Sequence, residues 1–214
     1  MVKRHSKKVE RKKLLVFASG RGSNFEAICR AVKSKKIKNT ELLGLVCNVE
    51  SAGCLKIAKK FKVPTYLIPH FGITRAEHEA KIWDQVSKLK FDLIVLAGYM
   101  RIMSSNFVEK FRDKKTGHTN IVNIHPSLLP SFPGLNAYEQ AYKHGVKIAG
   151  STVHLVGSGL DDGPIIAQES FRILENDSLN AIESRGLKIE HKLYVSSIDK
   201  ILNRRVLEIL GERK

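Results

Sequence analysis

Two polar side chains stand close together in the segment Asn123-Ile-His-Pro-Ser-Leu-Leu-Pro-Ser-Phe-Pro-Gly134. Asn123 and His125 are two residues apart, so in extended backbone their side chains lie on the same face of a strand. A carboxamide N–H and an imidazolium placed in this way can both donate to an oxyanion that forms when a nucleophile adds to a carbonyl group. Loss of one such donor typically lowers a reaction rate by about 10²–10³-fold. The alternative is that His125 is a structural hydrogen-bond donor at the end of a strand.

A carboxylate that could act on this histidine lies in the segment Leu160-Asp-Asp-Gly-Pro164, whose residues favour a turn. A carboxylate beside His125 would favour the charged imidazolium and make it a proton donor near neutral pH. Asp161 and Asp162 both lie in this turn, and the local sequence does not separate them; the alternative is a turn whose carboxylates satisfy their own backbone. His154, in the preceding apolar run, is expected to be a supporting or core residue.

The third motif is the glycine-containing segment Gly20-Arg-Gly-Ser-Asn24, between an apolar run and a stretch of helical period. Glycines let backbone approach a ligand closely, and free amides at a helix N-terminus bind phosphate. A dinucleotide is disfavoured because Phe25 stands where the fingerprint has its third glycine, and the second apolar run ends in Cys47-Asn48 without an acidic residue. The motif therefore favours a monophosphate or a similar anion, with a simple strand–helix turn as the alternative.

Metal, disulfide and membrane chemistry are not indicated. No His, Cys, Asp and Glu side chains have the spacing of a closed zinc or calcium site, so we predict no metal. Cys29, Cys47 and Cys54 are odd in number, which predicts reduced thiols in a cytoplasmic protein. The longest apolar run, Leu93–Met100, has eight residues, whereas about twenty are needed to cross a bilayer. We therefore expect no membrane association.

The elements that must position these motifs alternate between short apolar runs and longer helical periods. The apolar runs lack polar alternation, which is typical of strands covered by helices on both faces of a parallel sheet. We predict an α/β fold with a doubly wound, mostly parallel sheet, and the polar motifs follow strands, where ligands bind in such sheets. In the first half, strands are expected at Leu14–Ser19, Leu42–Cys47, Thr65–Ile68 and Leu93–Ala97, and helices near 24–35, 52–61 and 75–89.

The second half continues the alternation and ends in a helix. Asp177 is the expected N-cap of that helix, which runs to about Ile201, and Gly186 argues against one unbroken helix. The other expected elements are helices near 104–112 and 136–144 and strands at Ile121–Ile124, Ala149–Val156 and Pro164–Phe171.

The chain has 37 basic and 21 acidic residues among 214, a formal net charge of +16. Seven of the basic residues and one acidic residue fall within positions 1–13. We divide the chain into a basic flexible extension, residues 1–12, and a single catalytic domain, residues 13–214. The extension is most simply a solvated arm, and association with nucleic acid is the alternative.

Taken together, the motifs closely resemble those of the phosphoribosylglycinamide formyltransferases, the GAR transformylases of purine biosynthesis, within the folate-dependent formyltransferase family. The resemblance covers about residues 13–205 and implies the formyltransferase fold. It implies transfer of a formyl group from the co-substrate 10-formyltetrahydrofolate to the amine of glycinamide ribonucleotide. The segments that carry it are 20–24, Ala-Gly-Tyr-Met-Arg-Ile-Met (97–103), 123–130, 132–134, Leu-Asp-Asp-Gly-Pro-Ile-Ile (160–166) and Glu-His (190–191).

The resemblance also implies roles for individual residues. Asn123, His125 and Asp161 match the catalytic residues: Asn123 and His125 stabilise the tetrahedral intermediate, and Asp161 keeps His125 protonated. Gly22, Ser23, Asn24 and Glu190 match positions that bind the nucleotide substrate. Arg75, Met100, Arg101, Ile102, Met103 and Asn123 match positions on the folate side.

Three rival functions are set aside, two of them on expected domain content. Formyltetrahydrofolate deformylase, with water as acceptor, normally carries a regulatory domain before the catalytic one, and methionyl-tRNA formyltransferase adds a carboxyl-terminal RNA-binding domain. A nucleic-acid-binding module would rest only on the basic extension. We therefore expect glycinamide ribonucleotide and folate as partners, and neither nucleic acid nor membrane, while a homodimer stays open. Residues 112–119 are longer than the usual connection in the family.

Overall fold

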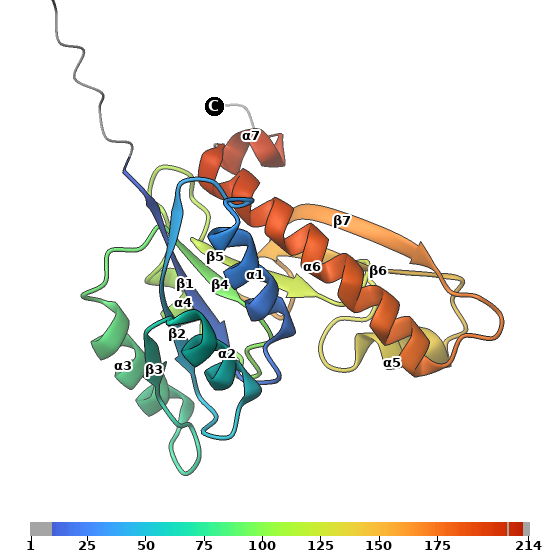
Figure 1. Ribbon diagram of the computed structural model, residues 1–214, viewed down its shortest axis with the longest axis horizontal. Coiled ribbons are helices and arrows are strands. Elements are labelled where there is room, and N and C mark those ends of the chain that lie inside the picture. The colour runs from blue at the N-terminus through green and yellow to red at the C-terminus, as the bar shows by residue number, and fades with distance from the viewer. Residues whose placement is uncertain (1–9, 205, 212–214) are drawn as a thin grey trace, which may run out of the picture.

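The computed structural model describes residues 10–204 and 206–211 of the chain. Most of the predicted extension lies outside these residues, and the first strand already begins at Lys12. Strands and helices alternate along most of the chain (Figure 1). The strands are β1 (Lys12–Ala18), β2 (Thr40–Cys47), β3 (Thr65–Leu67), β4 (Leu93–Leu96), β5 (Ile121–His125), β6 (Ile148–Leu155) and β7 (Ile165–Arg172). The helices are α1 (Ser23–Lys33), α2 (Gly53–Phe61), α3 (Arg75–Val86), α4 (Ser105–Glu109), α5 (Ala137–Lys143), α6 (Leu179–Asn203) and α7 (Val206–Leu210).

The strands form one seven-stranded sheet in the order β3-β2-β1-β4-β5-β6-β7. The pairs from β3 through β5 are parallel, whereas β6 pairs antiparallel with both β5 and β7. The predicted doubly wound, mostly parallel sheet is confirmed. Because β2 and β4 lie on either side of β1, the chain reverses its direction of winding there. In sheets of this kind the ligand site lies outside the carboxyl ends of the strands at that reversal.

Both faces of the sheet are covered, as the unbroken apolar runs predicted. Successive residues of β1 point to opposite faces: Val16 belongs to a core formed with α1, α2 and α6, and Phe17 to a core formed with α3 and α4. Figure 1 shows α1 and α6 together on one side of the sheet. A smaller third cluster joins α5 and α6 to β6 and β7 through Tyr138, Phe171 and Ile182.

The last long helix corrects two expectations. Its N-cap is Ser178, whose side chain accepts a hydrogen bond from the Ala181 amide, and not Asp177. The Asp177 carboxylate instead accepts from the Leu174 amide and pairs with Arg185. The helix is also continuous from Leu179 to Asn203, straight through Gly186. Helix α7 was not predicted, and the helix expected near 104–112 is shorter.

The three cysteines are all buried and carry free thiols. Burial raises the pKa of Cys29 to about 12, so its thiol stays protonated at neutral pH. The Sγ atoms of Cys47 and Cys54 lie 3.6 Å apart, next to the Ser19–Gly22 turn. In the described part of the chain, the helices are all too short or too polar to cross a membrane.

Candidate active site

Three of the predicted motifs lie at the carboxyl ends of β1, β4 and β5, which are neighbours in the sheet. The turn after β1 is tied to the loop after β4 by the Ser19 amide, which donates to the Gly98 carbonyl at 3.0 Å. The Ser19 hydroxyl accepts from the Met100 amide at 2.9 Å and donates to Oδ1 of Asn48 at 2.6 Å. These bonds connect the glycine-containing turn with the segment 97–103, so two motifs far apart in the sequence form one edge of the site.

The His125 ring, at the end of β5, has an acceptor at each nitrogen. Nδ1 lies 3.2 Å from Oδ2 of Asp161, and Nε2 donates to the Phe132 carbonyl at 2.8 Å. The ring is 4% exposed, so in this conformation it is closed off from water. Asp161 is therefore the acidic residue that faces His125, which the sequence did not distinguish from Asp162.

Asn123 and His154 are partners across β5 and β6 in the sheet register. The Nδ2 group of Asn123 lies 3.3 Å from Nε2 of His154, and Nδ1 of His154 donates to the Leu155 carbonyl at 2.9 Å. Nε2 of His154 thus faces both the Asn123 carboxamide and the Asp161 carboxylate. One Asn123 N–H points at His154, and the second is left for another acceptor.

Asp161 links the two histidines. Its Oδ1 lies 3.6 Å from Nε2 of His154, and its Oδ2 accepts from the Gly134 amide at 2.9 Å. Burial acts to raise the pKa of Asp161, but the contact with His154, the Gly134 amide and the charge of His125 outweigh it and lower that pKa. Asp161 is therefore ionised at neutral pH. Asn123, His154, Asp161 and His125 form one continuous chain of polar contacts.

The turn and a bulge explain how Asp161 and His154 reach this position. Asp161 has a left-handed backbone, with φ of 52°, which Asp adopts more readily than most residues. The register between β6 and β7 shifts between Val153 and His154, and such bulges re-aim side chains next to active sites. Asp162 faces away from His125, since its carboxylate accepts from the Gly159 amide at 2.9 Å.

The glycine-containing turn opens α1 without a side-chain cap. Gly22 is the N-cap residue, with φ of 83°, and a Cβ there would lie 2.8 Å from Cys54. Only glycine fits both constraints. The first amides of a helix have no intrahelical acceptor, so those of Ser23 and Asn24 are available to an anion. The geometry of the turn thus agrees with the anion site that its sequence indicated.

Glu190 lies near this turn on α6, as the resemblance implied. It is 7% exposed, and its Oε2 accepts from Nδ2 of Asn24 at 2.8 Å. The two residues are 166 positions apart in the sequence. Their contact brings the carboxylate beside the amides that begin α1.

The residues expected on the folate side occupy different environments. Met100 and Ile102 are 68% and 62% exposed, and Arg75 is exposed at the first position of α3. Met103 packs partly buried against the α3 and α4 core. The Arg101 guanidinium donates to the carbonyls of His70 and Ile73 at 3.0 and 3.3 Å. These hydrogen bonds connect the segment after β4 to the loop before α3.

Sequence reasoning missed several groups around the candidate catalytic residues. The Phe132 carbonyl occupies Nε2 of His125, and Phe132 has a left-handed backbone with φ of 53°. The Gly134 amide binds Asp161. No local pattern signals these backbone contacts, because they depend on how the loop after β5 folds back over the strand end.

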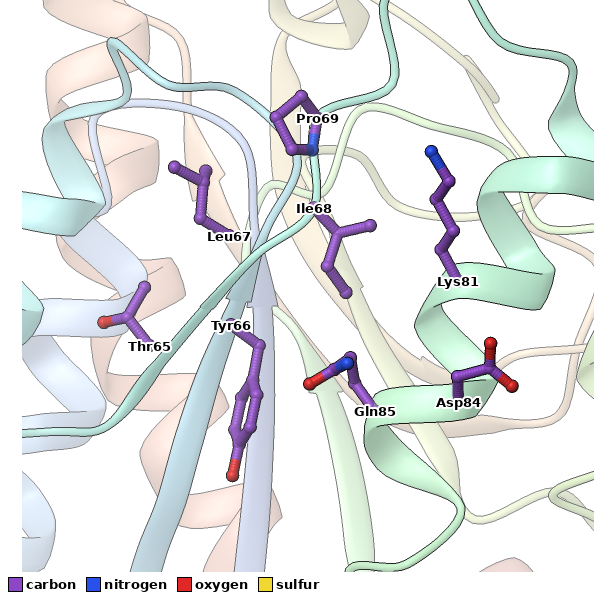
Figure 2. A pocket seen from close by; sticks show the side chains of 8 residues that line it. All are labelled: Thr65, Tyr66, Leu67, Ile68, Pro69, Lys81, Asp84 and Gln85. Atoms are coloured by element: carbon purple, nitrogen blue, oxygen red, sulfur yellow. The ribbon is translucent and has the colours of Figure 1, made fainter.

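A separate open hollow lies between β3 and α3, and Figure 2 shows its lining. Tyr66 and Ile68 come from the edge strand and the residue after it, and Lys81, Asp84 and Gln85 come from α3. The hollow includes none of the predicted site residues. Within the described ranges, no three His, Cys, Asp or Glu side chains are grouped so as to hold a metal ion.

Comparisons with known proteins identify the family of the chain. The model of the family described as formyl transferase matches residues 12–198. The chain is 44% identical over 192 residues to phosphoribosylglycinamide formyltransferase from Bacillus subtilis, covering 89% of this chain and 95% of that protein. It is 37% identical over 157 residues to formyltetrahydrofolate deformylase from Escherichia coli, covering 73% of this chain and 54% of that protein.

A solved structure has the same fold. Phosphoribosylglycinamide formyltransferase from Brucella melitensis matches with a TM-score of 0.82 and 37% sequence identity, covering 92% of this chain and 99% of that one. The resemblance inferred from the motifs is therefore confirmed at the level of the family and of the fold.

Proposed function

Because the chain belongs to the formyl transferase family, we propose that it transfers the formyl group of 10-formyltetrahydrofolate to the amine of glycinamide ribonucleotide, a step of purine biosynthesis. The observation that carries the proposal is the continuous contact chain from Asn123 to His125 at the carboxyl ends of the strands. The similarity to the Bacillus subtilis enzyme, which covers 95% of that protein, supports glycinamide ribonucleotide as the acceptor.

The reaction needs an oxyanion donor and a proton route. The amine nitrogen bonds to the formyl carbon, and the carbonyl electron pair moves to oxygen. The bond from that carbon to N10 of the folate then breaks, its electron pair goes to N10, and N10 gains a proton while the new amide nitrogen loses one. No covalent enzyme intermediate is required, which suits a site built from Asn, His and Asp.

In our proposal Asn123 and His125 stabilise the oxyanion. Asn123 uses the N–H that His154 does not occupy, and the His154 contact fixes the direction of the carboxamide. Nε2 of His125 exchanges the Phe132 carbonyl for the substrate oxygen, because both ring nitrogens are occupied in the present conformation. Asp161 stays ionised and holds the positive charge on the ring.

The remaining site residues are proposed to bind the two substrates. The amides of Ser23 and Asn24, with Gly22 before them, bind the phosphate of the nucleotide substrate, and Glu190 binds a donor group of the same molecule. On the folate side, Met100 and Ile102 offer exposed apolar surface. The other proposed folate-side residues are Arg75, Arg101, Met103 and Asn123.

A two-substrate assay tests the proposed function. Purified protein is mixed with 10-formyltetrahydrofolate, with and without glycinamide ribonucleotide, and both tetrahydrofolate and formylated product are measured. We expect tetrahydrofolate release to depend on the amine and to match the formylated product one to one. Release of formate and tetrahydrofolate at the same rate without the amine would instead show a deformylase, the function of the Escherichia coli relative.

A further inference from the structure

The carboxylate of Glu190 is held by a second residue that the motifs did not single out. Tyr138, on α5, donates its hydroxyl hydrogen to Oε1 of Glu190 at 3.0 Å, and its hydroxyl oxygen lies 3.0 Å from Oγ of Ser151. Burial raises the pKa of Tyr138, so the hydroxyl remains a neutral donor at all physiological pH values. With Asn24 on the other oxygen, each oxygen of the carboxylate has one fixed donor.

Gly186 makes room for this contact. It lies four residues before Glu190 on α6, so the two positions share one face of the helix. A Cβ at Gly186 would come within 2.2 Å of the Tyr138 hydroxyl oxygen and 2.3 Å of Cζ. Any side chain here would displace the ring from Glu190. This explains why a residue that weakens helices stands within a continuous helix.

The two hydrogen bonds fix the orientation of the Glu190 carboxylate, which can still accept further hydrogen bonds from a ligand. Tyr138 and Asn24 each donate one hydrogen bond to the carboxylate, so lone pairs remain on both of its oxygens for a ligand. The Oδ1 atom of Asn24 is buried and has no hydrogen-bond partner in the described part of the chain. Two kinds of acceptor thus lie beside the first turn of α1, which suits a ligand that brings hydroxyl or ammonium donors together with an anionic group.

We propose that Tyr138 is a positioning residue that aims Glu190 at the nucleotide substrate, and that Gly186 is the spacer that lets it do so. The inference rests on the proposed function, because it takes Glu190 as a contact of the amine substrate. It adds that affinity for this substrate, and not for the folate, depends on the α5–α6 contact. Neither residue touches the reacting atoms in this scheme.

Tyr138→Phe tests the proposal, since it removes one hydroxyl and keeps the ring in its cluster with Phe171 and Ile182. We expect the KM for glycinamide ribonucleotide to rise about tenfold, the loss typical of a hydrogen bond to a charged group. The kcat and the KM for 10-formyltetrahydrofolate should change less than about twofold. Tyr142→Phe, at an exposed tyrosine on the same helix, is the matched control.

A double-variant cycle separates positioning from packing. If Tyr138 acts through Glu190, Tyr138→Phe should have little further effect on KM in a Glu190→Gln background. Gly186→Ala should raise the same KM, with Ser184→Ala at an exposed site of α6 as its control. Thermal unfolding establishes that each variant is folded.

Three results would overturn the inference: an unchanged KM for the amine substrate, an equal loss for both substrates, or the same loss in the Glu190→Gln background. Failure of the proposed function is a different result, because the wild-type protein would then leave glycinamide ribonucleotide unmodified.

Discussion

Asn123 in β5 lies directly opposite His154 in β6, and Nδ2 of Asn123 is 3.3 Å from Nε2 of His154. The antiparallel register therefore sets the direction of a candidate oxyanion donor. His154 is 2% exposed, so its ring cannot exchange this partner for water. His154, expected from the sequence to be a supporting or core residue, is thus a buried partner of a candidate site residue.

This relationship predicts how variants of the two residues combine. Asn123→Ala should lower kcat by about 10²–10³-fold, because it removes an oxyanion donor. His154→Ala should lower kcat by a smaller factor, and the double variant should be no slower than Asn123→Ala alone, since His154 acts through Asn123. Steady-state kinetics of the three folded variants provides the measurement. A double variant whose loss equals the product of the single losses would contradict this.

A second prediction concerns the carboxylate beside His125. Asp161→Asn should lower kcat by about 10²-fold or more, because an amide cannot hold the positive charge on the ring that donates to the reacting oxygen. Asp162→Asn is the matched control from the same turn, and its kcat should stay close to that of the wild type. Equal losses in both variants would mean that the turn matters only as a structural element.

The contribution of the Asp161 carboxylate to the free energy of unfolding should also depend on pH. The folded-state pKa of Asp161 is lowered from 3.8. A lowered acid pKa stabilises the folded state at pH values above the unfolded pKa, and that contribution is lost as the pH falls through the folded pKa. The difference in free energy of unfolding between wild type and Asp161→Asn should therefore be largest near neutral pH and shrink below about pH 4. Urea unfolding at several pH values measures it, and a constant difference would exclude this role.

The sheet could be predicted from the sequence because its central strands are short runs of apolar residues without polar alternation. Runs such as Leu93–Leu96 are apolar on both faces, which restricts them to the interior of a covered sheet. Asn123 and His125 could also be proposed as site residues from the sequence, since they follow such a run and ligands bind at strand ends. The sequence could not decide between Asp161 and Asp162, because the choice depends on the left-handed backbone of Asp161 and on its contact with the Gly134 amide.

The errors near α6 have a physical origin as well. Asp and Ser are similarly good N-caps, so adjacent Asp177 and Ser178 cannot be separated by propensity alone. Arg185, two turns along the helix, draws the Asp177 carboxylate away from the cap position. Gly186 lowers helix propensity, but the packed contact with Tyr138 outweighs that local preference.

The cap correction gives a third prediction. Ser178→Ala should lower the free energy of unfolding by about 1 kcal/mol, because the Ala181 amide loses its acceptor. Ser184→Ala, at an exposed position within the helix, is the control and should have little effect. Thermal or urea unfolding measures both. If Ser178→Ala is neutral, the cap contributes nothing and the start of α6 is held by its tertiary contacts alone.

Asp177 supplies a fourth prediction with a defined pH window. Its pairing with Arg185 and the Leu174 amide lowers the pKa of Asp177 to about 2. The unfolded value is about 3.9, so the carboxylate stabilises the folded state above about pH 4, and this contribution disappears as the pH falls toward 2. Asp177→Asn should therefore unfold more easily than the wild type at pH 7 and similarly at pH 2. A difference that persists at pH 2 would contradict the assignment.

The last prediction concerns the turn that we propose binds the phosphate. Gly22 has φ of 83°, and a Cβ there would lie 2.8 Å from Cys54, whereas a Cβ at Gly20 would meet nothing within 4 Å. Gly22→Ala should therefore cost about 1–3 kcal/mol in free energy of unfolding, and Gly20→Ala, the stability control, should cost little. Because the strain displaces the first turn of α1, Gly22→Ala should also raise the KM for glycinamide ribonucleotide at least tenfold and leave that for the folate nearly unchanged. A stable Gly22→Ala protein with normal affinity for the amine substrate would show that the turn can relax and that the phosphate is bound elsewhere.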